Sequence, residues 1–141
     1  MQSNSTTVVG EDALAPQKTL VSDFIRLFYN EKNFDRAAEL LRPDFVNHHP
    51  GVGVGRQRTV DTFRKEVGDP FPEFTLTIRR MVAEDDHVWT HGLVQLEPDG
   101  PVAIVVDIWR IEDGLLAEKW DVHQGVPEGS SIAEMLSDWP S

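Results

Sequence analysis

The segment from Val102 to Gln124 constrains the fold most, because it places two acidic side chains inside otherwise apolar runs. It reads VAIVVDIWRI, then EDG, then LLAEKWDVHQ, which predicts two β-strands joined by a tight turn. Asp107 lies in the first strand and Asp121 in the second. A buried carboxylate is costly unless it is paired or neutral. We therefore expect the rest of the chain to cover this hairpin and to form a pocket over it.

The length of the turn decides whether the two acids share a face of the sheet. A three-residue loop, Glu112–Gly114, places Asp107 opposite Lys119. It also places Asp121 opposite Val105, so side-chain alternation points both acids to one face. A two-residue turn would shift the register by one residue and put the acids on opposite faces. We expect the three-residue loop.

The composition limits the partners that the protein can have. The chain has 141 residues, with 24 acidic and 13 basic side chains and a net charge of −11, which argues against nucleic acid or an anionic membrane as a partner. The absence of Cys excludes disulfides and thiolate chemistry. No apolar run reaches the roughly 18–20 residues that a membrane span needs, and the first fifteen residues do not resemble a signal peptide. We expect a cytoplasmic protein.

The apolar pattern predicts three helices followed by a four-stranded antiparallel meander. We expect residues 1–15 to be a mobile arm, residues 16–127 to form a single domain, and residues 128–141 to form a tail with a short helix. The helices are expected at 16–30, after an N-cap at Asn33, and at 57–67; the strands are expected at 73–83, 87–96, 102–111 and 115–124. This order predicts an α+β domain with helices on one face of a curved sheet.

A candidate pocket follows from the register of the meander. A five-residue loop at 97–101 would pair Leu96 with Val102 and place His91 opposite Asp107. One face of the sheet would then combine an apolar surround with a few polar groups, as is typical of a small-molecule site. The residues expected on that face are Trp89, His91, Leu93, Val105, Asp107, Trp109, Lys119, Asp121 and His123, with Phe28 and Phe63 added from the helices.

Each of these residues also has a purely structural interpretation. Asp107 would form a structural network if it paired with Lys119 or His91. Others are simply explained as core or solvent-exposed side chains: Trp89, Trp109, His48, His49 and His123. Asp121 is hardest to explain in this way, because no basic residue lies opposite it in the expected register.

We expect no metal and no cofactor. His48 and His49 are adjacent in an extended segment and should point in opposite directions. The sequence contains neither an HExxH motif nor a closely spaced pair of histidines with a carboxylate. The glycines at 51, 53 and 55 do not lie between a strand and a helix in the way that a nucleotide-binding loop requires.

Three segments resemble SnoaL-like polyketide cyclases of the nuclear transport factor 2-like superfamily. VVDIWRIEDGLLAEKWDVHQ resembles the terminal hairpin of that family, FVNHHP the segment after its second helix, and DHVWTHG its second strand. The resemblance covers about residues 18–127. It implies a cone-shaped fold, in which a curved antiparallel sheet carries the three helices on its concave face, and a homodimer.

The same resemblance implies site residues. It assigns the acid/base role to Asp121 and places Asp107, His48 and His91 around the pocket. This sequence departs from the family pattern at Lys119, where the family often has His, and at His49, where Asn is frequent.

The favoured hypothesis is an enzyme that acts on a small apolar carbonyl compound by proton abstraction next to the carbonyl, in an aldol-type cyclisation or an isomerisation. Asp121 would be the base, with its pKa raised by burial, and His48 or His91 would stabilise the enolate oxygen. Epoxide hydrolysis is less favoured, because that branch carries Arg at the position of Val105. The alternative outside catalysis is a module that binds a small ligand or only dimerises.

A homodimer is also expected from the second face of the sheet. The helices cover one face only, and a large apolar surface left in water usually marks an interface. The residues expected there are Val88, Val94, Ile104, Val106, Ile108, Trp120 and Val122. The tail should dock as a short amphipathic helix near the pocket mouth or the partner subunit, through Ile132, Met135, Leu136 and Trp139.

Overall fold

The computed structural model describes the backbone of residues 2–137 and the side chains of residues 14–137. Its helical segments are α1 (Gln2–Ile25), the π-helical turn η1 (Arg26–Asn30), α2 (Phe34–Ala38), α3 (Arg56–Phe63), the π-helical turn η2 (Arg64–Gly68) and α4 (Ile132–Leu136). Its strands are β1 (Leu41–Asn47), β2 (Gly53–Val54), β3 (Thr75–Glu84), β4 (His87–Gln95), β5 (Val102–Glu112) and β6 (Leu115–Gly125).

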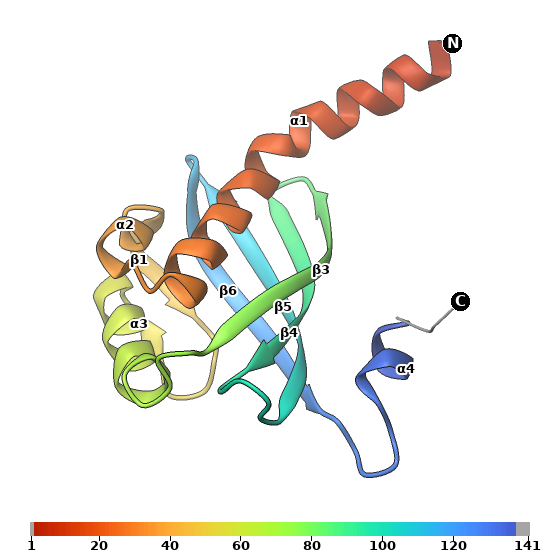
Figure 1. Ribbon diagram of the computed structural model, residues 1–141. Helices are drawn as coiled ribbons and strands as arrows, with labels where there is room; N and C mark the ends of the chain where they lie inside the picture. Colours follow the sequence, from red (N-terminus) through yellow and green to blue (C-terminus); the bar gives the residue numbers. More distant parts are fainter. Residues whose placement is uncertain (1, 138–141) are drawn as a thin grey trace.

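The six strands form one curved, unclosed sheet in the order β2-β1-β6-β5-β4-β3 (Figure 1). Strands β3 to β6 are the expected antiparallel meander. The segment after α2 joins the same sheet, because β1 pairs in parallel with β6 and antiparallel with β2. The prediction of an α+β fold with a curved sheet is confirmed, although one strand pair is parallel rather than antiparallel.

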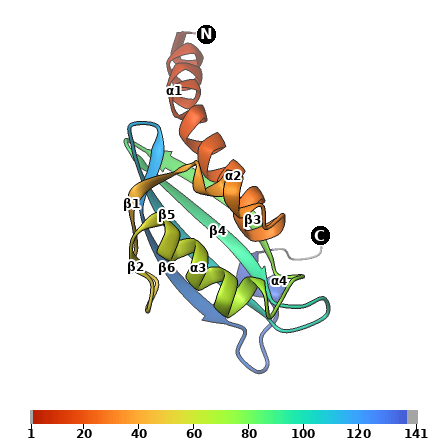
Figure 2. The same cartoon turned by 90° about the vertical axis from the view of Figure 1, so that its left-hand side faces the viewer.

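The helices before β3 cover the concave face of this sheet (Figure 2). The apolar side of the first helix is buried as its spacing predicts: Phe24 and Phe28 are each 1 % exposed and their rings stack 4.9 Å apart. Phe24 also packs edge-on against Trp109 of β5, which is fully buried. An aromatic core therefore joins the helices to the middle of the sheet.

The helix boundaries differ from the prediction mainly at the N-terminus. Helix α1 begins at Gln2 and includes Pro16, where the sequence predicts the helix to start. The mobility of residues 1–15 and the domain limits remain predictions. The cap at Asn33 is confirmed, because its side chain accepts a hydrogen bond from the backbone N–H of Arg36. No helix among residues 2–137 is both long and apolar enough to span a membrane.

The β5–β6 turn has two residues, not three. Glu112 pairs with Leu115, which leaves Asp113 and Gly114 as the turn. Both have positive φ, at 53° and 77°, as a type I′ turn requires. The expected three-residue loop is therefore wrong.

The two-residue turn alone would have put Asp107 and Asp121 on opposite faces of the sheet, but a β-bulge returns them to the same face. Past the turn the register shifts once, so that Arg110 pairs with Glu118 and Ala117 is the extra residue of β6. Asp107 then pairs directly with Asp121. The two acids share one face, as predicted, but they lie directly opposite each other rather than diagonally apart.

The register between β4 and β5 also differs by one residue from the prediction. Gln95 pairs with Val102, so the loop has six residues, and Thr90 rather than His91 lies opposite Asp107. Because a shift of one residue exchanges the faces of a strand, all odd-numbered side chains of β4 are moved to the outer face. The predicted pocket residues Trp89, His91 and Leu93 are therefore on the outer face, and the predicted interface residues Val88 and Val94 are on the inner one.

The tail docks on the outer face of the sheet, and Figure 1 shows α4 on the other side of β3 and β4 from the helices. Arg80 of β3 donates a hydrogen bond to the carbonyl of Leu136 at 3.2 Å and contacts Nδ1 of His91 at 2.7 Å. The side chain of Leu136 is fully buried. The predicted docking helix is thus present as α4, while Trp139 lies outside the described residues.

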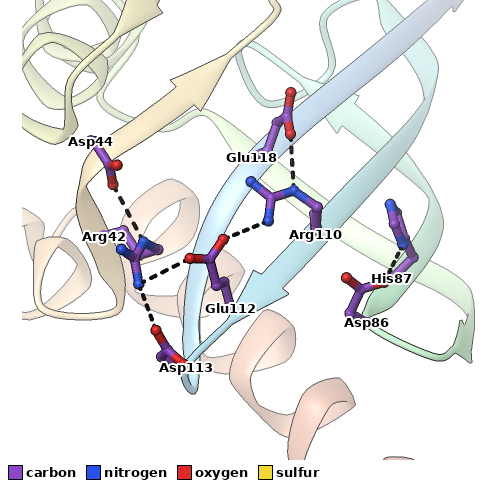
Figure 3. A network of polar contacts seen from close by, with 8 residues as sticks. All are labelled: Arg42, Asp44, Asp86, His87, Arg110, Glu112, Asp113 and Glu118. Carbon is purple, nitrogen blue, oxygen red and sulfur yellow. Dashed lines mark hydrogen bonds and ion pairs between the residues drawn. The ribbon is translucent and has the colours of Figure 1, made fainter.

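Ion pairs tie the β5–β6 turn to its neighbours (Figure 3). Arg42 of β1 lies 3.2 Å from the carboxylate of Asp113 and 3.7 Å from that of Glu112. Arg110 contacts Glu112 and the cross-strand Glu118. Exposed pairs of this kind stabilise a fold by at most about 1 kcal/mol each, so they support the turn without determining it.

Candidate active site

A cavity of about 130 Å³ lies between the helices and the inner face of the sheet. An apolar protein cavity of about 150 Å³ binds benzene, so the volume of this one is close to that of a single-ring site. Its apolar wall is formed by Phe28, Tyr29, Val52, Phe63, Val67, Phe74, Leu76, Val94 and Val105. Its polar groups are Asn47, His49, Thr59, Thr62, Glu66, Asp107, Lys119, Asp121 and His123.

Lys119 is the centre of the polar groups. Its ammonium lies 3.0 Å from Asp121, 3.5 Å from Asp107 and 3.2 Å from the hydroxyl of Tyr29. It also lies 5.6 Å from the ring centre of Trp109. Only 8 % of the Lys119 side chain is exposed. A buried cation thus holds two carboxyl groups that face each other across two strands.

Asp107 is the more deeply buried of the two acids. The residue is 1 % exposed, and neither carboxyl oxygen has a hydrogen-bond partner among the described residues. The 3.5 Å separation from Lys119 is long for a hydrogen bond and is better described as an ion pair. Burial raises the pKa of Asp107 above its ordinary value, although the charge of Lys119 opposes this. The raised pKa favours the neutral form of Asp107.

Asp121 differs from the prediction in its pKa. Burial favours its neutral form, but Lys119 and then His49 outweigh this effect and hold the pKa of Asp121 below its ordinary value. The sequence predicts a raised pKa because no cation lies opposite Asp121. The cation comes instead from the same strand, since Lys119 stands two residues earlier on the same face. Asp121 is therefore ionised at neutral pH.

The charge of Lys119 is stable in this position. Burial opposes the charge, but Tyr29, Asp107 and Asp121 together more than offset it and raise the pKa of Lys119 above its usual value. Burial likewise raises the pKa of the Tyr29 hydroxyl. At neutral pH the buried group thus comprises one cation, the ionised Asp121, and Asp107, whose raised pKa shifts it towards the neutral form.

Two histidines contact this group at the mouth of the cavity. Nδ1 of His49 lies 3.0 and 2.9 Å from the two oxygens of Asp121. Nε2 of His123 lies 3.9 Å from Oδ2 of the same carboxylate. The side chains of His49 and His123 are 44 % and 43 % exposed, so they connect Asp121 to solvent.

His49 lines the site although its sequence pattern does not predict this. Alternation predicts that His48 and His49 point in opposite directions, but not which of them faces the pocket. The pairing of Asn47 with Lys119 decides this, because His49 then follows Asn47 on the inner face. The orientation of His49 could be predicted only by knowing that β1 pairs in parallel with β6.

His48 lies on the outer side, contrary to the prediction. Its Nε2 is 2.6 Å from the carboxylate of Glu118, and its ring stacks on Trp120 at 5.1 Å. His91 is likewise outside the pocket, beside Arg80. Neither histidine can contact a ligand in this cavity.

The predicted pocket residues that lie on the helices or on the inner face of the sheet fall into two groups. Those that line the cavity as predicted are Phe28, Phe63, Val105, Asp107, Lys119, Asp121 and His123. Trp109 shares their face of the sheet but is fully buried in the core, where it lies beside the Lys119 ammonium.

His49, Asp121 and His123 also form a potential set of metal ligands. One ligand atom from each residue lies within 4.8 Å of the other two. Spacing along the sequence predicts no pair of histidines near a carboxylate, because it does not register contacts between distant segments. The fold brings His49 to the Asp121-x-His123 pair from such a segment.

Sequence comparison gives the family of this chain. The model of the SnoaL-like domain matches residues 21–119, which is most of the chain. The chain belongs to the SnoaL-like family. No curated protein matches it.

Solved structures agree with the fold. IdmH from Streptomyces antibioticus, described as a candidate polyketide cyclase, is 21% identical with a TM-score of 0.64, over 77% of this chain and 91% of that one. A candidate ketosteroid isomerase from Kribbella flavida is 19% identical with a TM-score of 0.68, over 86% of this chain and 87% of that one. TsrD from Streptomyces laurentii is 23% identical with a TM-score of 0.64, over 77% of this chain and 88% of that one. At these identities the likeness shows the fold alone.

Proposed function

We propose that this SnoaL-like protein is an enzyme that moves a proton next to the carbonyl group of a small apolar compound, in an aldol-type cyclisation or an isomerisation. The observation that carries the proposal is the pair Asp107 and Asp121, which face each other beside a buried Lys119 in an otherwise apolar cavity. Proton transfer of this kind needs a base and a donor that stabilises the enolate oxygen. The cavity contains candidates for both.

Asp121 is the base in this proposal. It carries a negative charge, and it is the one of the two facing acids that contacts the half-exposed His49. The arrangement resembles that of ketosteroid isomerase, where an Asp base acts beside a second Asp that donates a hydrogen bond, although the pKa of that base is modestly raised and the pKa of Asp121 is lowered. That similarity of arrangement supports the proposal by analogy only.

The donor comes from Asp107 or Lys119. Both oxygens of Asp107 lack a hydrogen-bond partner within the described part of the chain, so this carboxyl, in its protonated form, can donate a hydrogen bond to a ligand oxygen. The Lys119 ammonium is held beside it. These groups replace His48 and His91, which the structure places outside the cavity.

His49 connects the base with solvent. Because its Nδ1 contacts Asp121 while the ring is 44 % exposed, it can accept the abstracted proton and exchange it with water.

The volume of the cavity favours a substrate with one ring inside and any larger part outside the mouth. The absence of Cys fits a reducing compartment, and we propose a cytoplasmic location.

Deuterium exchange next to the carbonyl tests this proposal with simple carbonyl compounds in place of the natural substrate. The protein is incubated in heavy water with a panel of cyclic ketones and β-diketones, and exchange is followed by NMR. We expect exchange with the parent protein and a loss of roughly 10²–10⁴-fold with Asp121→Asn, the range of general-base contributions. His48→Gln, on the outer face, should retain the parental rate.

Two outcomes would refute the proposal. In the first, the parent protein exchanges none of the compounds. In the second, Asp121→Asn keeps the parental rate. Either result, together with ligand binding that survives in Asp121→Asn, would favour a binding module in which Lys119 and the two acids are a structural network.

We also propose a homodimer through the outer face of the sheet. That face carries the cross-strand row Val82, Trp89, Ile108 and Trp120, in which Val82 is 62 % and Trp89 49 % exposed. Val122, which is 66 % exposed, stands two residues beyond Trp120 on the same face of β6. An exposed apolar patch of this kind suits a second copy of the same chain.

A further inference from the structure

Three residues at the mouth of the cavity offer ligand atoms of the types that divalent transition metals prefer. Asp121 and His123 stand two residues apart on β6 and therefore point to the same face. His49 reaches them from the loop after β1, and its ring centre lies 5.7 Å from that of His123. Two imidazoles and one carboxylate suit Zn²⁺, Co²⁺, Ni²⁺ or Fe²⁺.

The distances fit one ion. In a tetrahedral zinc site with bonds of about 2.0–2.1 Å, neighbouring ligand atoms lie roughly 3.3 Å apart. The carboxylate of Asp121 is 2.9 Å from His49 and 3.9 Å from His123, and all three ligand atoms lie within 4.8 Å. Side-chain shifts below about 1 Å would close the set, and both histidines are exposed enough to make them.

The residues behind these ligands hold them in place. Asn47, which is 7 % exposed, accepts a hydrogen bond from the backbone N–H of His49 at 2.9 Å. Lys119 holds Oδ2 of Asp121 at 3.0 Å. The two oxygens of a carboxylate offer about four lone-pair sites, so Asp121 can accept from Lys119 and still bind the ion. Such support of ligands by a second layer of hydrogen bonds is typical of metal sites.

We propose that His49, Asp121 and His123 bind one divalent transition-metal ion of the Zn²⁺ class. Three protein ligands leave one tetrahedral position for water or a ligand oxygen, and the cavity lies beside it. The carboxylate of Glu66 lines the same cavity and adds negative charge there. This binding is independent of the proposed function.

A consequence for activity rests on the proposed function. An ion bound to Asp121 occupies a lone pair that proton abstraction requires. Zinc should therefore inhibit the exchange reaction, and a chelator should restore it. Metal binding itself is measured without any substrate, so that failure of one proposal is distinguishable from failure of the other.

Calorimetry with Zn²⁺ and absorption spectroscopy with Co²⁺ test the site in the full chain, purified without an affinity tag. We expect one ion per chain, and a visible Co²⁺ band of tetrahedral type. His49→Gln and His123→Gln should each weaken binding at least about tenfold. The matched control is His48→Gln, which changes the neighbouring residue on the opposite face and should bind as the parent does.

The melting temperature distinguishes misfolding from the loss of a metal-binding side chain. Because His123 is exposed, His123→Gln should melt at the same temperature as the parent. The proposal is overturned if the parent binds no zinc at millimolar concentration. It is also overturned if His123→Gln binds as tightly as the parent, or if His48→Gln loses as much affinity as His49→Gln.

Discussion

Asp107 and Asp121 stand directly opposite each other on neighbouring strands, with the ammonium of Lys119 3.5 Å from one and 3.0 Å from the other. Two facing carboxylates repel each other when both are ionised. One buried cation compensates one of them, and the deeper acid favours its neutral form. The site is therefore a three-residue unit, and changing any one member changes the protonation of the others.

Replacing Lys119 should destabilise the protein strongly. Lys119→Met keeps the length of the side chain but leaves the acids without a cation, and breaking a buried ion pair costs about 3–5 kcal/mol. We expect a loss of about 3 kcal/mol in the free energy of unfolding at neutral pH, measured by urea denaturation. The exposed Lys65 provides the control Lys65→Met, which should change little. Equal stability of both variants would show that Lys119 is not electrostatically essential.

Asp107→Asn should change how stability depends on pH. The pKa of Asp107 is raised in the folded protein, so folding takes up a proton. Its contribution is present in full below the unfolded pKa, near 3.9, and is lost as pH rises towards the folded pKa, at up to about 1.4 kcal/mol per pH unit. Asn imitates the neutral acid and removes this slope. Unfolding free energies between pH 4 and pH 8 should therefore fall less steeply in the variant; parallel curves would contradict a neutral Asp107.

Association should depend on the outer face of the sheet. Light scattering is expected to give the mass of two chains for the parent protein. Val122→Asp places a charge on the exposed apolar part of this face and should produce monomers. Leu96→Asp, which places the same charge at an exposed apolar residue in the loop between β4 and β5, should leave the dimer intact. A monomeric parent, or a dimeric Val122→Asp, would exclude this interface.

Removal of the tail should lower stability. Truncation after Pro127 deletes the fully buried Leu136 and frees Arg80 from its carbonyl partner. Burying one Leu contributes roughly 1.5–3 kcal/mol, and we expect a loss of that order with a lower melting temperature. Truncation after Ser137 keeps α4 and serves as the comparison. A melting temperature that both truncations leave unchanged would mean that α4 adds nothing to the fold.

The four strands of the meander and the family could be predicted from the sequence, because alternation and turn residues are local properties. Predicted strand ends mostly lie within a residue or two of the observed ones, and Asn33 caps its helix as expected. The common face of Asp107 and Asp121 was predicted for the wrong reason. The expected turn was one residue too long, and the bulge at Ala117 shifted the register by one residue more.

The wrong predictions concern features that depend on the exact length of a loop or on contacts that had not been considered. One extra residue in the loop after β4 moved His91 to the outer face. The roles of His48 and His49 could be distinguished only through the pairing of β1 with β6. The pKa of Asp121 was predicted in the wrong direction, because only cross-strand neighbours of that carboxylate were considered and Lys119 lies on its own strand.

The extra residue at Ala117 gives the site an unusual sensitivity to length. If Ala117 were deleted and the turn kept, every later side chain of β6 would change face. Glu118, Trp120 and Val122 would enter the cavity, and the lysine and acid of the site would point to solvent without any change in their identity. In relatives aligned to this chain, a one-residue gap between the turn and Asp121 would therefore separate proteins that keep the site from proteins that retain its residues but not its chemistry.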